Sequence, residues 1–182
     1  GDLSELKAGL VKIGIGEEKI SLFEERALVA ATMVVNETGV GLMIHTEKGS
    51  FAHEVLDRLE SFNCPLNRVV LAHMDRKPIT SLHDELAERG VYLGHDGAGR
   101  TKYFPDDILV KLFQNLIELG KVSHILLGAD VARASRYISY GGGPGLEYLG
   151  NAFLPKLIDA TDFKIVNEVI TSNPQKWLAF SK

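Results

Sequence analysis

Apolar runs recur along the chain, and each is followed by a segment with helical spacing of apolar residues. The runs contain mainly branched aliphatic residues with little polar alternation, which is typical of parallel strands covered on both faces. Five strands are predicted, over residues 9–16, 40–46, 68–75, 91–96 and 124–131. Helices are predicted over residues 21–38, 50–62, 79–89, 105–119, 146–158 and 163–170, with a last one from Pro174.

Boundary residues support this division of the chain. Ser21 is a good helix N-cap, while Gly39 and Gly90 follow predicted helices, as C-terminal glycines do. Five β/α units in series predict an α/β fold with a parallel sheet and helices outside it. At 182 residues the chain is expected to form one domain, residues 1–182, built either as an open doubly wound sheet or as part of a barrel.

Polar residues follow or end every predicted strand. Ligand sites in both architectures lie at the carboxyl ends of the strands. The candidates are Lys12, His45, His73, His95 with Asp96, and Asp130. This recurrence favours a metal site at one end of a barrel, and the sequence after the first strand lacks the third glycine of a dinucleotide-binding loop.

Each candidate also has a purely structural interpretation. Lys12 stands among large apolar residues, where burial would lower its pKa, but a lysine near a strand end can also extend to solvent. His45 and His73 could be core histidines, and Asp130 or Asp96 could cap the following helix. We expect His53 and His83 to lie on the surface, and His124 to lie at the opposite end of its strand.

Composition narrows the class of partner. The net charge of −4 gives no basic surface for nucleic acid or an anionic membrane, so a small molecule is the expected partner. Cys64 is the only cysteine, which excludes an internal disulfide and suits a reducing compartment. No apolar run is long enough to span a bilayer and no signal peptide opens the sequence. A cytoplasmic location is therefore expected.

A family resemblance is carried by these same segments. KAGLVKIGIG, GLMIHT, VVLAHMD, YLGHD, LLGAD and the closing TSNPQKWL resemble the phosphotriesterase family of the amidohydrolase superfamily, from the fourth barrel strand to the C-terminus. The resemblance covers essentially the whole chain. It implies a TIM (β/α)8 barrel, of which this chain would contain the C-terminal five β/α units, strands four to eight, and the C-terminal helices.

The resemblance also implies a metal centre and a reaction. Lys12 would be carboxylated by carbon dioxide and would bridge two divalent metal ions, zinc above all, with manganese or cobalt as alternatives. His45 and His73 would bind one metal ion and Asp130 the other, with His95 and Asp96 in supporting positions. A metal-bound hydroxide would attack an ester carbonyl, and Asp130 would take up the proton.

One feature departs from the family pattern. The family's remaining ligands form a His-x-His pair at the end of the first strand, and this sequence contains no His-x-His. The chain is therefore expected to be the C-terminal part of a barrel. It would need either the missing N-terminal half or a homo-oligomer, because exposed sheet edges seek partners.

Two basic and aromatic loops are expected to determine the substrate. They contain Lys102, Arg133, Arg136 and Tyr137, which could clamp a phosphate or could simply form a solvated basic rim. The stretch SRYISYGGGPGLEYL resembles a branch of the family that acts on lactones of phosphorylated sugars. Alternatives are a phosphotriesterase, a lactonase for unphosphorylated substrates, and an inactive half-barrel that serves as an assembly module.

Overall fold

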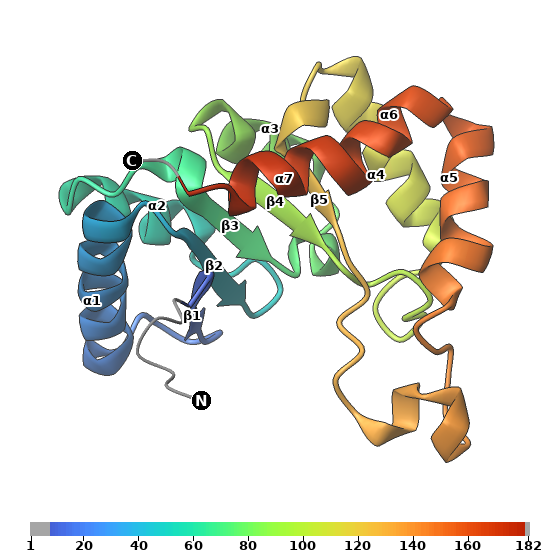
Figure 1. Ribbon diagram of the computed structural model, residues 1–182, viewed down its shortest axis with the longest axis horizontal. Helices are drawn as coiled ribbons and strands as arrows, with labels where there is room; N and C mark the ends of the chain where they lie inside the picture. The colour runs from blue at the N-terminus through green and yellow to red at the C-terminus, as the bar shows by residue number, and fades with distance from the viewer. Residues whose placement is uncertain (1–7, 181–182) are drawn as a thin grey trace, which may run out of the picture.

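Five strands form one parallel sheet in which each strand pairs with its neighbours in the sequence (Figure 1). The computed structural model describes residues 8–180. The order is β1 (Leu10–Ile15), β2 (Gly41–Thr46), β3 (Val69–Ala72), β4 (Tyr92–His95) and β5 (Ile125–Leu127). This arrangement confirms the predicted α/β class and the series of five β/α units.

Four helices follow the first four strands: α1 (Leu22–Thr38), α2 (Ala52–Ser61), α3 (Thr80–Glu88) and α4 (Asp106–Glu118). The predicted start of α1 is confirmed, because Ser21 and Glu24 form a reciprocal capping box that satisfies free backbone N–H groups. Its end is also as predicted, since Gly39 adopts a left-handed conformation.

Helices α1 to α3 pack on the outer face of the sheet. Odd-numbered residues of β1 and even-numbered residues of β2 point to that face, where Ile15, Leu42 and Ile44 join Leu28 and Leu56 in one buried cluster. A second cluster, centred on Phe113 and Phe153, lies between α4 and the C-terminal helices. The outer face therefore carries the main core.

Within residues 8–180, the inner face is covered at the amino ends of the strands. Helix α7 (Asn173–Leu178) crosses there (Figure 1), and Trp177 packs with Val70 and Leu126. The Trp177 Nε1 group donates to the carbonyl of Arg68 at 2.9 Å, and Asn173 donates to the carbonyls of Val122 and Ile125. Helix α7 thus closes one end of the inner face and leaves the carboxyl ends of the strands accessible.

Three predicted boundaries were wrong. The third and fifth strands are shorter than expected, so that His73 lies beyond β3 and Asp130 lies three residues beyond β5. The helix expected to start at Pro174 continues a helical run composed of α6 (Phe163–Asn167), a π-helical turn (Glu168–Ser172) and α7. Similarly, a π-helical turn (Leu149–Phe153) leads directly into α5 (Leu154–Ala160).

Within residues 8–180, no helix combines the length and the apolar composition that crossing a membrane would require.

Candidate functional site

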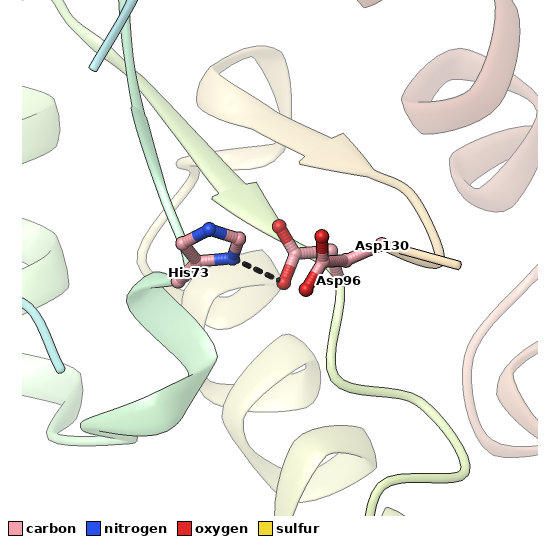
Figure 2. Close-up of side chains that lie close together, drawn as sticks. All are labelled: His73, Asp96 and Asp130. Carbon is pink, nitrogen blue, oxygen red and sulfur yellow. Dashed lines mark hydrogen bonds and ion pairs between the residues drawn. The ribbon is translucent and has the colours of Figure 1, made fainter. Parts of the chain in front are cut away.

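Three polar residues from three consecutive strand ends meet at the carboxyl edge of the sheet (Figure 2). One ligand atom from each of His73, Asp96 and Asp130 lies within 4.8 Å of those of the other two. Nδ1 of His73 is 2.7 Å from Oδ1 of Asp96. Asp96, expected only in a supporting position, therefore lies as close to the centre of the site as the two predicted ligands.

The backbone turns sharply at two of these positions. His73 and Asp130 have φ values of 65° and 44°, in the left-handed region that residues with side chains rarely adopt. At His73 the chain leaves β3 and enters a short 3₁₀ turn, Met74–Arg76. Backbone strain of this kind is concentrated at functional sites, which agrees with the assignment of this edge as the candidate site.

A buried carboxylate fixes the neighbouring loop. Asp75 is 2% exposed, and its Oδ2 accepts hydrogen bonds from the backbone N–H groups of Asp96, at 2.9 Å, and Gly97. A Cβ at position 97 would lie 2.6 Å from that oxygen, so glycine is required there. Burial, followed by the negative charge of Asp96, raises the pKa of Asp75 to about 6. Asp75 thereby joins the ends of β3 and β4.

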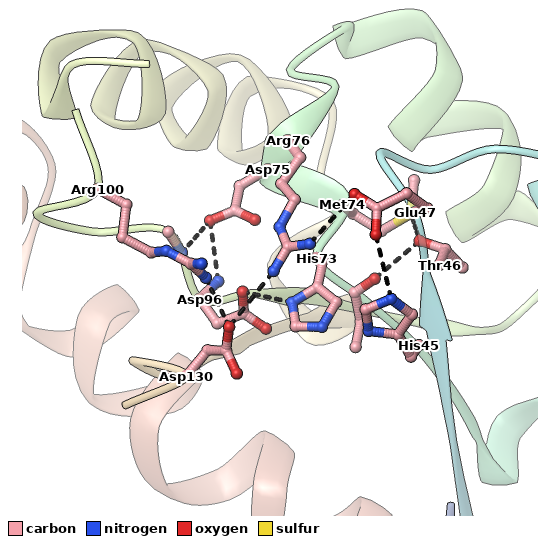
Figure 3. A network of polar contacts seen from close by, with 12 residues as sticks. His45, Thr46, Glu47, His73, Met74, Asp75, Arg76, Asp96, Arg100 and Asp130 are labelled. Atoms are coloured by element: carbon pink, nitrogen blue, oxygen red, sulfur yellow. Dashed lines mark hydrogen bonds and ion pairs between the residues drawn. The ribbon is translucent and has the colours of Figure 1, made fainter. Parts of the chain in front are cut away.

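Three arginines converge on Asp130, and Figure 3 shows two of them, Arg76 and Arg100. Its Oδ2 atom lies 2.5 Å from Arg100, 3.3 Å from Arg76 and 3.5 Å from Arg136. Burial alone would raise the pKa of Asp130, but His73 and the guanidinium groups outweigh burial, so the pKa lies below its usual range. Asp130 is therefore ionised near neutral pH.

His45 lies beside this group. Its ring is 4.5 Å from the ring of His73, measured between centroids, with an interplanar angle of 75°. Burial and the neighbouring His73 lower the pKa of His45, while Glu47 acts in the opposite direction. His45 therefore lies next to His73, and His73 lies next to Asp130, while His45 is not part of the cluster of His73, Asp96 and Asp130.

Lys12 is on the same sheet face as His45 but is exposed. Lys12 pairs in register with Met43, and Gly14 pairs with His45. The expected burial of Lys12 is not found in the described part of the chain, because β1 is an edge strand with no strand beyond it. Its role as a metal bridge stays a prediction.

Two histidines differ from expectation. His83 was expected on the surface, but its exposed fraction is 0%. His95, expected in a supporting position, faces the helices instead: it stacks on His83 with 5.3 Å between ring centroids and contacts Phe113. Burial, followed by the charge of His83, lowers the pKa of His95 to about 3. His53 is exposed, and His124 lies directly before β5, as predicted.

The two basic loops form a polar cleft next to Asp130. Its volume is about 310 Å³, and its lining includes Arg100, Lys102, Arg133 and Arg136. None of the described residues that line it is acidic. Tyr137 supports the second loop by donating from its hydroxyl to the carbonyl of Val131 at 3.0 Å.

Sequence reasoning missed four residues of this network. Asp75, Arg76, Arg100 and Glu47 all lie within three residues of a predicted strand end or within a basic loop. For Asp75, Arg76 and Arg100 a signal is present in the HMDR and GAGR segments, where charged residues directly follow a strand or fill a glycine-rich loop, whereas Glu47 lies in neither segment. Arg76 and Arg100 also lie over the ring of Tyr103, at 4.9 and 5.0 Å from its centroid.

The donor types suit a divalent metal ion. Imidazole nitrogen and carboxylate oxygen are the usual protein ligands of zinc and manganese, and here they come from the segments that directly follow β3, β4 and β5. The arginines around Asp130 neutralise a carboxylate that a metal ion could neutralise in their place. The residues present thus fit part of a metal centre.

Comparison with known proteins identifies the family. The family model described as "Phosphotriesterase family" matches residues 1–178. A phospho-furanose lactonase of Mycoplasmopsis synoviae (strain 53) is 32% identical over 186 aligned positions, which cover 98% of this chain and 53% of that protein. The phosphotriesterase homology protein of Escherichia coli (strain K12) is also 32% identical, over 86% of this chain and 53% of that protein.

Solved structures of similar proteins superpose closely on this chain. A lactonase from Listeria monocytogenes superposes with a TM-score of 0.94 and 33% identity, over 97% of this chain and 55% of that one. The Escherichia coli phosphotriesterase homology protein, in complex with phosphate in its active site, gives a TM-score of 0.91 and 29% identity, over 98% of this chain and 62% of that one. The chain spans about half the length of the curated relatives it matches. It forms five β/α units of a TIM barrel and belongs to the phosphotriesterase family.

Proposed function

We propose that this chain carries the substrate-binding side of a metal-dependent hydrolase that opens a lactone of a phosphorylated sugar. The observation that carries the proposal is the cleft next to Asp130, which is lined by Arg100, Lys102, Arg133 and Arg136. Arg100 and Arg136 pair with Asp130, so Lys102 and Arg133 are the lining cations that best suit a phosphate dianion, and a guanidinium group can bind it through paired hydrogen bonds. Relatives named phospho-furanose lactonase support this choice of substrate.

The metal ligands in this proposal are Lys12, His45, His73 and Asp130. His45 lies beside His73, His73 lies beside Asp130, and Lys12 lies on the same face of the sheet as His45. Two divalent ions, zinc in the first place, would polarise the substrate carbonyl and activate a water molecule. Carboxylation of Lys12 would add the bridging anion and requires that Lys12 be enclosed by further strands.

The residues of the chain have separate tasks in this scheme. Arg133 and Lys102 hold the phosphate at the outer end of the cleft, so that binding energy from the unreactive group orients the lactone. Asp130, ionised next to the arginines, accepts a proton during ring opening. Tyr137 keeps the loop of Arg133 and Arg136 in place through its bond to Val131.

We further propose that three additional β/α units complete the barrel. An eight-stranded barrel needs three strands beyond the five present here, whereas a second copy of this chain would bring five. The partner is therefore a segment with three strands and a His-x-His pair. It would pair with both edge strands, β1 and β5, because a closed barrel has no open edge.

The experiment compares three substrates with zinc-loaded protein: a phosphorylated sugar lactone, its unphosphorylated parent and a neutral phosphotriester. The phosphorylated lactone should have the highest kcat/KM. Arg133→Ala should lower that value about 10- to 100-fold, mainly through KM, because a charge-assisted hydrogen bond contributes roughly 1.5–3 kcal/mol. Lys164→Ala, which removes an exposed cation in α6, is the control.

Other results point to the alternatives. Equal turnover of both lactones would refute the phosphate clamp. Preference for the phosphotriester would indicate a phosphotriesterase. Inactivity towards all three substrates, even with the complementary strands present, would indicate that the chain is an inactive half-barrel that serves as an assembly module.

A further inference from the structure

The backbone that carries His45 is rigidly attached to the neighbouring strand. Thr46 is buried, and its hydroxyl donates to the carbonyl of Ala72 at 2.8 Å. This bond adds to the β2–β3 pairing and holds the end of β2 against the end of β3. One edge of the His45 ring faces His73, so the orientation of the ring depends on what its nitrogen atoms contact.

Glu47 contacts one of these nitrogens. Nε2 of His45 lies 3.4 Å from Oε2 of Glu47, on the side of the ring away from Asp130 (Figure 3). The other carboxylate oxygen, Oε1, lies 3.6 Å from Nη1 of Arg76. Glu47 therefore stands between an imidazole and a guanidinium, both of which can donate to it.

Arg76 fixes Glu47 in this position. Its side chain is 6% exposed, and its second terminal nitrogen lies 3.3 Å from Oδ2 of Asp130. A buried guanidinium needs acceptors on several sides, and here Glu47 and Asp130 supply them. Through Arg76, the carboxylate beside His45 is connected to the carboxylate proposed as a metal ligand.

We propose that Glu47 is a positioning residue for His45: it accepts the Nε2 proton and leaves Nδ1 as the nitrogen that binds a metal ion. This inference rests on the proposed metal site. Metal-binding histidines usually donate their second ring N–H to a carboxylate or carbonyl, which fixes the tautomer and the ring orientation. His73 is also paired with a carboxylate, but through its other ring nitrogen: Nδ1 contacts Asp96, and Nε2 is the nitrogen left for a metal ion.

The tautomer of His45 tests the inference directly. Metal-free protein with ¹⁵N-labelled histidine is studied at pH 7.5 by long-range ¹H–¹⁵N correlation, and His45→Gln assigns the signals. We expect protonated Nε2 in the wild type and in Glu47→Gln, whose amide oxygen can still accept. Glu47→Ala should produce a mixture of tautomers. Glu37→Ala, at an exposed glutamate of α1, should leave the spectrum unchanged.

Zinc titration by calorimetry supplies the second measurement. Glu47→Ala should weaken Zn²⁺ binding about 10- to 100-fold, and Glu47→Gln should weaken it less. Protonated Nδ1 in the wild type, or the same tautomer in Glu47→Ala, would overturn the inference even if Zn²⁺ still bound. Protonated Nε2 that depends on Glu47, without Zn²⁺ binding by the wild type, would support the positioning role and refute the metal site instead.

Discussion

Charge is distributed at the candidate site so that each carboxylate has its own cationic or N–H partner. Asp130 has three guanidinium groups, Asp75 has two backbone N–H groups and Asp96 has His73. These carboxylates approach one another at a half-buried edge, where unpaired negative charges would repel. The arginines thus compensate the charge of Asp130, while backbone N–H groups and His73 serve the other two carboxylates.

A second group of titratable residues lies outside this site, in the layer between the sheet and the helices. His95 and His83 stack there with both rings buried. In the unfolded chain, His95 binds a proton below about pH 6.5, whereas in the folded protein its pKa is about 3. Stability from this residue is therefore present above pH 6.5 and is lost as the pH falls towards 3.

We predict that His95→Leu reduces the acid sensitivity of folding. The free energy of unfolding of the wild type should fall between pH 6.5 and 4.5, with at most about 1.4 kcal/mol per pH unit from His95. The variant should show a smaller slope in urea unfolding, and the exposed His53→Gln should not. The raised pKa of Asp75 makes folding more favourable as the pH falls, which opposes the effect of His95. Asp75 is present in the wild type and in both variants, so it does not affect their comparison. An unchanged slope in His95→Leu would contradict the prediction.

At the scale of elements, the two ends of the strands have different roles. Helix α7 closes the amino ends through Trp177, whose ring also lies against Gly41, where a Cβ would be 3.1 Å from it. His45, His73 and Asp130 lie at or beyond the carboxyl ends, whereas Lys12, expected at a strand end, lies in the middle of β1. The stability of the inner face and the chemistry of the site are therefore assigned to opposite ends of the sheet, as is usual in barrels.

We predict that Trp177→Phe and Trp177→Ala destabilise the chain to different degrees. Loss of the hydrogen bond to Arg68 should cost about 1 kcal/mol, and loss of the whole ring about 3–5 kcal/mol. Chemical unfolding followed by circular dichroism measures both values. Trp177 is the only tryptophan, so its fluorescence in the wild type reports on this contact directly. Equal effects of the two variants would contradict the proposed packing.

The elements also show which parts of the structure the sequence predicts. Ser21 and Gly39 marked the ends of α1 correctly, because capping depends on local chemistry. Periodicity predicted the five strands but extended β3 and β5 too far, since apolar residues also fill the turns after them. His83 was misplaced because a helix in this layer is buried on more than one side. Glu47 and Arg76 have no periodic signal, and only the fold reveals their contacts.

At the scale of the whole molecule, β1 and α1 form an exposed boundary. Phe23 and Met33 on α1 are 80% and 65% exposed. Apolar residues of α1 line one cleft of about 350 Å³, and a larger one of about 890 Å³ lies against Leu10 and Val11 of β1. Exposed apolar residues grouped in this way are typical of interaction surfaces. It lies where the proposed three β/α units would be added.

We predict that the double variant Phe23→Lys/Met33→Lys lowers self-association of the isolated chain and weakens its binding to the complementary three-unit segment. Sedimentation velocity over a range of concentrations measures the first effect, and titration with the segment measures the second. Leu146→Lys, at an equally exposed residue outside this boundary, is the control. If the double variant behaves as the control does, the boundary is not an interface.

The strand order described above has a consequence for folding. Because every strand pairs with its immediate neighbour in the sequence, each β/α unit can dock onto the one synthesised before it, without waiting for distant segments. The candidate site is different: its residues extend from His45 to Asp130, so its geometry depends on the arrival of the last loop. We therefore expect a nascent chain to acquire a stable sheet first and a competent site last.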